Sequence, residues 1–139
     1  MGTANKEYVK KLIKDIEEAI SIILEDCSKS FEILSRAEKS EIRCYIIVLV
    51  ETIVALAYHV ARRIYGLEPR TPIQTLRMLA EKGFISFNEA EDLVELVRLR
   101  NLIVYRYWEV NDGVIYENVK RDFTCVRKFI ESVRNVLRV

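Results

Sequence analysis

The chain has 139 residues, of which 50% are hydrophobic and 31% are charged, a balance that is ordinary for a soluble domain. Its net charge of +1 provides no general attraction to nucleic acid or membranes, so a site for a polyanion must be local. The three cysteines, Cys27, Cys44 and Cys125, match no zinc spacing and indicate free thiols in a reducing compartment. We expect a single domain over residues 1–139 with a core that needs no disulfide.

The location of the protein follows from two stretches of sequence. The N-terminus has no apolar signal core, which predicts a cytoplasmic protein. Residues 44–61 are nearly all apolar, but Glu51 lies in their centre, where a charge would cost roughly 2.5–3.5 kcal/mol in a membrane. We therefore interpret this stretch as the core helix of a bundle and expect no membrane partner.

Helical signals begin at the N-terminus. All four glycines and both prolines lie between segments of helical periodicity, and residues 3–65 contain neither. Residues 5–26 carry a stripe of apolar side chains at helical spacing. Ser28 is expected to cap a short helix that ends near Ala37.

The middle of the chain predicts one long helix and one short helix. Ser40 is the expected N-cap of a helix over residues 41–65, which is apolar on nearly all sides and should lie in the middle of a bundle. Thr71 and Pro72 begin the short helix, because proline suits the first helical position, and Gly83 ends it.

Two more helices complete the expected fold. Ser86 and Glu89 form a capping box that begins a helix running to a turn at Gly113. The last helix starts near Asn118 and has a narrow apolar seam suited to antiparallel packing. The prediction is an all-α, up-and-down bundle of four main helices plus one or two short ones.

One arginine lies on the apolar face of the helix before the turn. At about 100° per residue, Arg100 falls on the same side as Leu93 and Val97. A buried guanidinium keeps its proton and needs an anion. Glu51, the one acid of the apolar stretch, is the obvious partner within the protein, and a phosphate is the alternative outside it.

The sequence around this arginine has a recognisable pattern. Residues 100–107 read Arg-Asn-Leu-Ile-Val-Tyr-Arg-Tyr, followed by Trp-Glu-Val-Asn. This segment resembles the motif of the HEPN superfamily of small helical RNases and toxins, and most closely that of HepT-type toxins, Arg-Asn-x-x-Val-His-x-Tyr. Tyr105 occupies the place of the family histidine. Further matches are Arg43-Cys44-Tyr45, Val50-Glu51, His59 and Leu79-Ala80-Glu81-Lys82-Gly83.

The resemblance implies a function and a set of site residues. HepT-type toxins cleave RNA without a metal ion or cofactor, and they act as homodimers in which two motif helices line one cleft. Each is paired with a minimal nucleotidyltransferase antitoxin, which silences the toxin by transferring AMP to the motif tyrosine, here Tyr107. By the same resemblance, Arg100, Asn101 and Tyr105 are the catalytic candidates, and Glu51 supports Arg100 as an ion pair.

The replacement of histidine by Tyr105 leaves two functions open. Imidazole titrates near 6.5 and phenol near 10, so a tyrosine can donate a proton but is a poor base at neutral pH. The chain is either an RNase toxin of weakened chemistry or a non-catalytic HEPN module that serves a nucleotidyltransferase. On a straight helix Tyr105 lies about 140° from Arg100, whereas Tyr107 lies about 20° away and should share its groove. His59, the only histidine, is more often a hydrogen-bonded core residue than a replacement catalyst.

Overall fold

The computed structural model describes residues 4–119 and 123–139, and these residues contain helices and turns without a strand. The expectation of an all-α fold is therefore confirmed. In chain order the elements are α1 (Lys6–Asp26), η1 (Phe31–Ile33), α2 (Arg36–Arg63), α3 (Pro72–Glu81), α4 (Phe87–Tyr105), η2 (Tyr107–Glu109), α5 (Asp112–Val119) and α6 (Thr124–Leu137), where η denotes a 3₁₀ turn.

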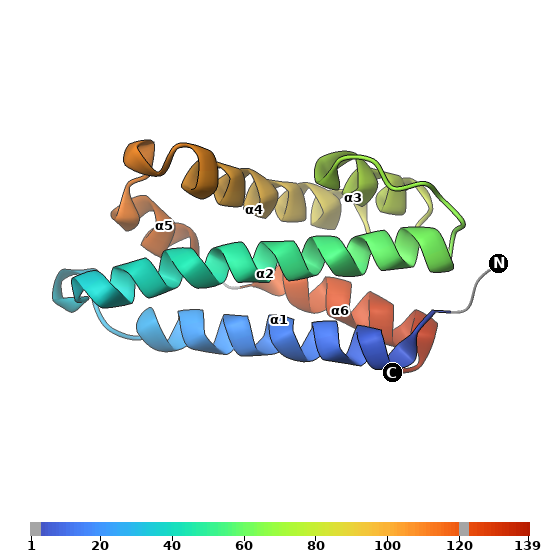
Figure 1. Ribbon diagram of the computed structural model, residues 1–139, viewed down its shortest axis with the longest axis horizontal. Helices are drawn as coiled ribbons and strands as arrows, with labels where there is room; N and C mark the ends of the chain where they lie inside the picture. The colour runs from blue at the N-terminus through green and yellow to red at the C-terminus, as the bar shows by residue number, and fades with distance from the viewer. Residues whose placement is uncertain (1–3, 120–122) are drawn as a thin grey trace.

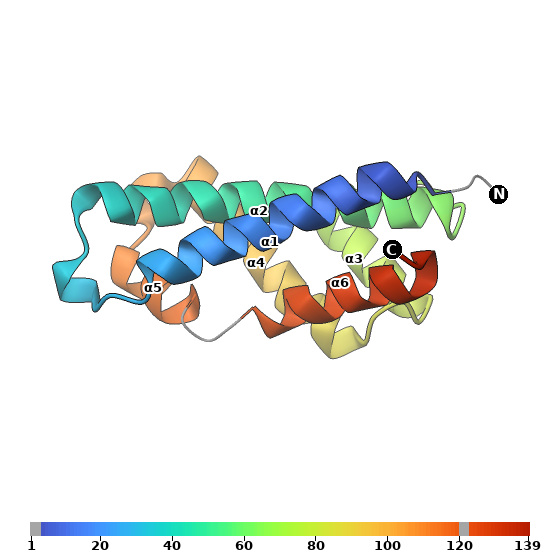
Figure 2. The same cartoon turned by 90° about the horizontal axis from the view of Figure 1, so that it is seen from below.

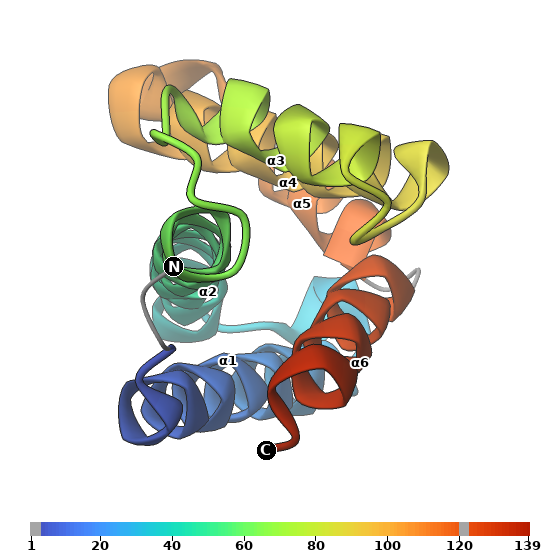
Figure 3. The same ribbon diagram turned by 90° about the vertical axis from the view of Figure 1, so that its right-hand side faces the viewer.

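The long helices lie roughly side by side, with α2 between α1 and α4 (Figure 1). Seen from below, α6 and α1 both lie on the side of the bundle that is away from α4 (Figure 2). The end-on view shows α1, α2, α4 and α6 around a common interior, with α3 beside α4 (Figure 3). Each of the four helices therefore has one side that must be apolar.

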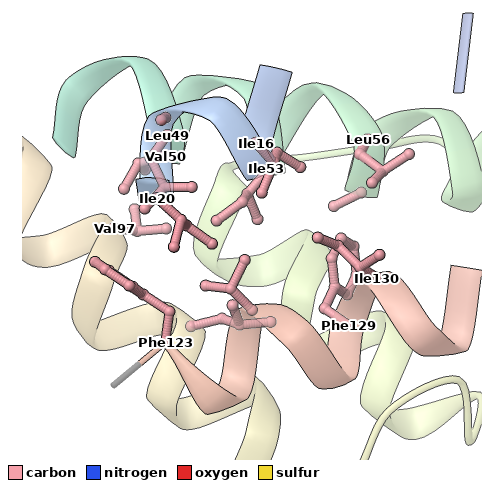
Figure 4. Packing of buried hydrophobic residues seen from close by; sticks show 14 of the residues in the cluster. Ile16, Ile20, Leu49, Val50, Ile53, Leu56, Val97, Phe123, Phe129 and Ile130 are labelled. Atoms are coloured by element: carbon pink, nitrogen blue, oxygen red, sulfur yellow. The ribbon is translucent and has the colours of Figure 1, made fainter. Parts of the chain in front are cut away.

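The interior is filled by aliphatic and aromatic side chains from all four helices (Figure 4). Ile16 of α1, Leu49 of α2 and Phe129 of α6 are fully buried, and Val97 of α4 is nearly so. Burying such a side chain contributes roughly 1.5–3 kcal/mol, so this core is the main source of stability. The apolar stripe expected over residues 5–26 supplies the α1 part of the core, and Asn5 caps that helix by accepting from the Tyr8 N–H at 3.1 Å.

The start of α2 differs from the expectation. Ser35, and not Ser40, is the N-cap, because the Ser35 hydroxyl accepts from the Glu38 N–H at 3.1 Å and Glu38 Oε1 accepts from the Ser35 N–H at 2.9 Å. This capping box satisfies two backbone donors at once. The expected short helix from Ser28 to Ala37 is only the 3₁₀ turn η1.

Helix α2 is long and apolar enough to cross a membrane when judged by length and composition alone. A core helix of a soluble bundle passes the same test. In this fold Ile46, Leu49, Ile53 and Leu56 of α2 are at most 2% exposed within the core.

The middle of the chain begins as expected, but the helix that carries the motif ends early. Thr71 caps α3 with Pro72 in its first turn, and the Ser86 hydroxyl accepts from the Glu89 N–H at 3.0 Å at the start of α4. Helix α4 then ends at Tyr105, followed by a residue with φ −139° and ψ 44°.

The segment after α4 turns back to form its own short helix. Gly113 is not a turn residue as expected but the second residue of α5, and its N–H donates to Asn111 Oδ1 at 2.8 Å. The chain turns here because Tyr116 of α5 is buried and donates to the Lys29 carbonyl at 2.6 Å. The last helix, expected from about Asn118, is described as α6 from Thr124, whereas Asn118 and Val119 belong to the end of α5; residues 120–122 lie outside the described part of the chain.

Candidate functional site

Arg100 of α4 is bound to Glu51 of α2. Its Nη2 donates to Glu51 Oε1 at 2.6 Å, and its Nη1 donates to Asn101 Oδ1 at 3.1 Å. The Arg100 side chain is 21% exposed and that of Glu51 is 56% exposed, so the pair lies at the edge of the core and not inside it. The hydrogen bond to Glu51 raises the pKa of the Arg100 guanidinium above its usual value, which keeps the cation charged at every working pH.

Tyr105 also belongs to this cluster, despite its angular position on the helix. The Arg100 guanidinium carbon lies 5.9 Å from the centre of the Tyr105 ring, within the usual distance for a cation–π contact. The flexible arginine side chain bends toward the end of α4, so the 140° separation does not keep the two groups apart. Arg100, Asn101, Tyr105 and Glu51 therefore form one cluster of polar groups.

Tyr107 lies outside the helix, so the prediction from helical spacing was wrong. Because α4 ends at Tyr105, Tyr107 is part of the 3₁₀ turn η2. Its ring packs edge-on against Trp108, with 5.4 Å between the ring centres. Both side chains are about two-thirds exposed, 64% for Tyr107 and 67% for Trp108. The turn, and not helical periodicity, sets the direction of these side chains.

Arg43 of α2 holds the backbone of this turn. Its Nε donates to Asp112 Oδ1 at 2.6 Å, its Nη1 to the Tyr107 carbonyl at 3.2 Å and its Nη2 to the Val110 carbonyl at 3.0 Å. Sequence reasoning used Arg43 only as part of the family pattern and missed this contact. Two features of the sequence could have indicated this contact: Arg43 is a single cation at the start of an apolar stretch, and Asp112 is an acid just after the motif.

His59 is placed on another side of α2. Its Nε2 accepts from the Asn5 N–H at 3.1 Å, and its ring lies 5.2 Å from that of Tyr8. Burial, with the nearby charges of Arg63 and Arg62, lowers the pKa of His59 below its usual value. This imidazole joins the end of α2 to the start of α1, which is the hydrogen-bonded role expected for it.

Apolar side chains are exposed around the polar cluster. Val48 of α2 and Val104 of α4 are each 38% exposed, close in sequence to Glu51 and Arg100, and Tyr105 is 67% exposed. Two hollows of about 500 and 820 Å³ occur elsewhere, between α1 and α6 and between α4, α5 and α6. Neither is lined by Arg100, Glu51 or Tyr105. In the described part of the chain, no group of three or more His, Cys, Asp or Glu could hold a metal ion.

Comparison with solved structures shows the same fold in several proteins. The chain is similar to YutE of Bacillus subtilis, a cytosolic protein of unknown function, with a TM-score of 0.84, 16% identity and coverage of 99% of this chain and 93% of that one. It is also similar to a tri-AMPylated HEPN toxin of Shewanella oneidensis in complex with MNT antitoxin, with a TM-score of 0.84, 19% identity and coverage of 92% and 97%. A toxin–antitoxin structure with AMP-PNP gives a TM-score of 0.83 at 18% identity, with coverage of 93% and 98%.

Sequence comparison identifies the family. A search of curated protein sequences gave no significant match. The profile of the family described as ribonuclease HepT-like matches residues 10–133, which include the Arg100–Tyr107 motif and the helices around it. The chain therefore belongs to the HepT-like family.

Proposed function

We propose that the protein is a HEPN ribonuclease toxin that cleaves RNA without a metal ion, with Arg100 as the group that binds the reacting phosphate. The observation that carries the proposal is that Glu51 and Asn101 use only some of the hydrogen-bond donors of this guanidinium. Arginine has five N–H donors, and Glu51 and Asn101 each accept from one nitrogen of Arg100. The Arg100 side chain remains partly exposed beside the exposed phenol of Tyr105.

The chemistry assigns roles to Arg100, Glu51 and Tyr105, while Asn101 accepts a hydrogen bond from Arg100. The 2′-hydroxyl attacks the adjacent phosphorus, its proton passes to a base, and the departing 5′-oxygen takes up a proton. A forked cation suits two oxygens of the pentavalent phosphorane, and Glu51 orients that fork. Tyr105 donates a proton to the leaving oxygen or a hydrogen bond to the phosphate. Because the cluster holds no good base at neutral pH, the 2′-hydroxyl proton passes to hydroxide from solvent, so cleavage is expected to be slow at neutral pH and to rise toward alkaline pH.

A homodimer is part of the proposal. An exposed apolar surface flanked by polar groups is typical of a protein contact, and Val48, Val104 and Tyr105 provide such a surface beside Arg100. A two-fold symmetric contact across it would place two copies of Arg100 along one cleft. Light scattering at micromolar concentration should therefore give the mass of a dimer, and a monomer would count against this arrangement.

The proposed partner is a minimal nucleotidyltransferase antitoxin in the cytoplasm. The support is the fold shared with an AMPylated HEPN toxin in complex with MNT antitoxin, together with the 64% exposure of Tyr107. In the transfer, the Tyr107 phenolic oxygen would bond to the α-phosphorus of ATP, pyrophosphate would leave, and the phenolic proton would pass to solvent. A bulky, anionic AMP on this turn would then oppose RNA binding beside Arg100.

The second candidate function is a non-catalytic HEPN module that serves the nucleotidyltransferase. The observation in its favour is Tyr105, since the side chain beside Arg100 is a phenol where the family motif has an imidazole. This module would bind its partner and accept AMP on Tyr107 but would leave RNA intact.

One set of cleavage assays separates the two functions. Total RNA is incubated with EDTA between pH 6 and 9, with wild type, Arg100→Ala, Tyr105→Phe and Tyr105→His. Arg98→Ala is the matched control, because Arg98 is two residues away on the same helix and forms an exposed ion pair with Glu95 at 2.9 Å. For an RNase, Arg100→Ala abolishes cleavage, Tyr105→His raises it at neutral pH, and Arg98→Ala changes little.

Other outcomes would contradict specific parts of the proposal. Rapid wild-type cleavage with a neutral optimum that survives Tyr105→Phe would remove the role given to Tyr105 and return attention to His59. Intact RNA with every variant, combined with AMP transfer that is lost in Tyr107→Phe, would establish the binding module instead. Tyr8→Phe is the control for the AMP-transfer assay, because Tyr8 is a 40% exposed tyrosine on α1, away from the motif; this variant should still accept AMP.

A further inference from the structure

The segment that carries Tyr107 has little regular structure of its own. Between the end of α4 at Tyr105 and the start of α5 at Asp112 there is only the three-residue turn η2. Two backbone bonds close this turn, from the Glu109 N–H to the Arg106 carbonyl at 2.8 Å and from the Val110 N–H to the Tyr107 carbonyl at 3.3 Å. So short a turn needs further contacts to keep one conformation.

Arg43 supplies such contacts from outside the segment. Its three nitrogens reach the Tyr107 carbonyl, the Val110 carbonyl and the Asp112 carboxylate, at 3.2, 3.0 and 2.6 Å. These acceptors span the turn from its first residue to the helix that follows. The planar guanidinium has donors in fixed directions, so it can bind all three only when the backbone has this one shape.

The Arg43 side chain is 22% exposed and that of Asp112 is 33% exposed, so the group is partly shielded from water. Charge-assisted hydrogen bonds in such a setting are stronger than neutral ones. Arg43 itself belongs to the rigid helix α2, which also carries Glu51 two turns later. One helix therefore orients both Arg100, through Glu51, and the Tyr107 turn, through Arg43.

We infer that Arg43 is a positioning residue that holds the 106–112 segment, so that Tyr107 and Trp108 keep a fixed place directly after Tyr105, the last residue of α4. For its effect on activity this inference rests on the proposed function, but its structural part does not. Arg43 donates to two carbonyls and a carboxylate of the chain itself, so each of its three nitrogens already has a partner. Its loss is expected to free the turn while the core, which lies on other faces of α2, stays folded.

Trp108 makes a direct test possible, because it is the only tryptophan of the chain and lies in the segment itself. The fluorescence anisotropy of Trp108 and its quenching by acrylamide report the mobility of the turn without any assay of activity. Arg43→Ala is expected to lower the anisotropy and to increase quenching. Arg43→Lys keeps a positive charge beside Asp112 but lacks the forked guanidinium. Its anisotropy and quenching are expected to lie between those of wild type and Arg43→Ala.

The control is Arg77→Ala, since Arg77 also makes two bonds to a carboxylate, that of Glu91 at 2.9 Å, but on the surface of α3 and α4. It should leave the Trp108 signal unchanged. Asp112→Ala is the second variant, which removes one of the three acceptors and should mobilise Trp108 even if Arg43→Ala fails to fold. If Arg43→Ala folds and the mobility of Trp108 is unchanged, the inference is overturned. If only Asp112→Ala folds, unchanged Trp108 mobility in that variant overturns it.

The activity measurements distinguish this inference from the proposed function. If wild type cleaves RNA, Arg43→Ala should lower kcat by on the order of 10²-fold, with a smaller change in KM, because the freed 106–112 segment no longer fixes Tyr105 at the end of α4. If wild type does not cleave RNA but Trp108 becomes mobile in Arg43→Ala, the proposed function fails and the positioning role stands. If wild type cleaves and Arg43→Ala keeps full kcat, the positioning role fails and the proposed function stands.

Discussion

The two sides of α2 have different tasks, although both are largely apolar in sequence. On the inner side, Leu49 is fully buried and Ile53 is 2% exposed. On the outer side, Val48 is 38% exposed, and the polar side chains of Arg43 and Glu51 hold the motif turn and Arg100. The inner side provides stability through burial, whereas the outer side leaves apolar area uncovered and uses charges to orient other groups. An apolar residue that stays exposed is therefore a better guide to function here than a buried one.

The largest expected effect comes from a pair of adjacent residues on these two sides. Leu49→Ala should lower the free energy of unfolding by about 2–5 kcal/mol, because it leaves a cavity in the core. In the separate subunit, at concentrations too low for a dimer, Val48→Ala should change it by less than about 0.5 kcal/mol, because the side chain is already partly in water. Urea titration of the two variants measures both values, and equal losses would mean that the outer side is buried in the assembled protein.

A smaller effect is expected at Asp26, the buried last residue of α1. Burial, together with the neighbouring carboxyls of Glu41 and Glu38, raises the pKa of Asp26 from 3.8 to about 6. The folded state thus favours the protonated form, and the stability from this group is present below pH 4 and lost as the pH rises through 6.

Asp26→Asn should remove this pH dependence. Above pH 7 the variant should be more stable than wild type by on the order of 1 kcal/mol, and near pH 4 the advantage should vanish. Urea titrations at the two pH values measure the difference, with Asp92→Asn on the exposed part of α4 as control. A variant that is less stable than wild type at pH 7.5 would show that the ionised carboxylate has a favourable partner.

The smallest effect on stability is expected at the ion pair of the outer side. Because Glu51 is 56% exposed, Arg100→Ala should lower the free energy of unfolding by only about 0.2–1 kcal/mol. Glu51→Gln should cost less, since an amide oxygen can still accept from Arg100. Thermal denaturation of both variants checks this order. A loss of several kcal/mol in Arg100→Ala would mean that the pair is buried, as it would be within a dimer contact.

Local signals predicted helices well where one residue had a single possible role. Thr71 and Ser86 cap α3 and α4 as predicted, because the hydroxyl of each accepts from the backbone N–H three residues later. The prediction of Ser40 as the N-cap of α2 was wrong, because the Glu38 side chain accepts from the Ser35 N–H and completes a capping box with Ser35 instead. The end of α4 was also wrong, since no breaker follows Tyr105 and the helical pattern continues through Trp108.

The sequence alone determined the helical class, the starts of α1, α3 and α4, the family motif and Glu51 as a partner for Arg100. All of these follow from residues close in sequence or from a lone charge in an apolar stretch, where few alternatives exist. Only the tertiary structure decided that the motif helix stops at Tyr105 and that Arg43 binds the turn beyond it. The reason is that Arg43 meets the Tyr107 carbonyl across 64 residues of sequence, and such a contact depends on how α2 and α4 pack.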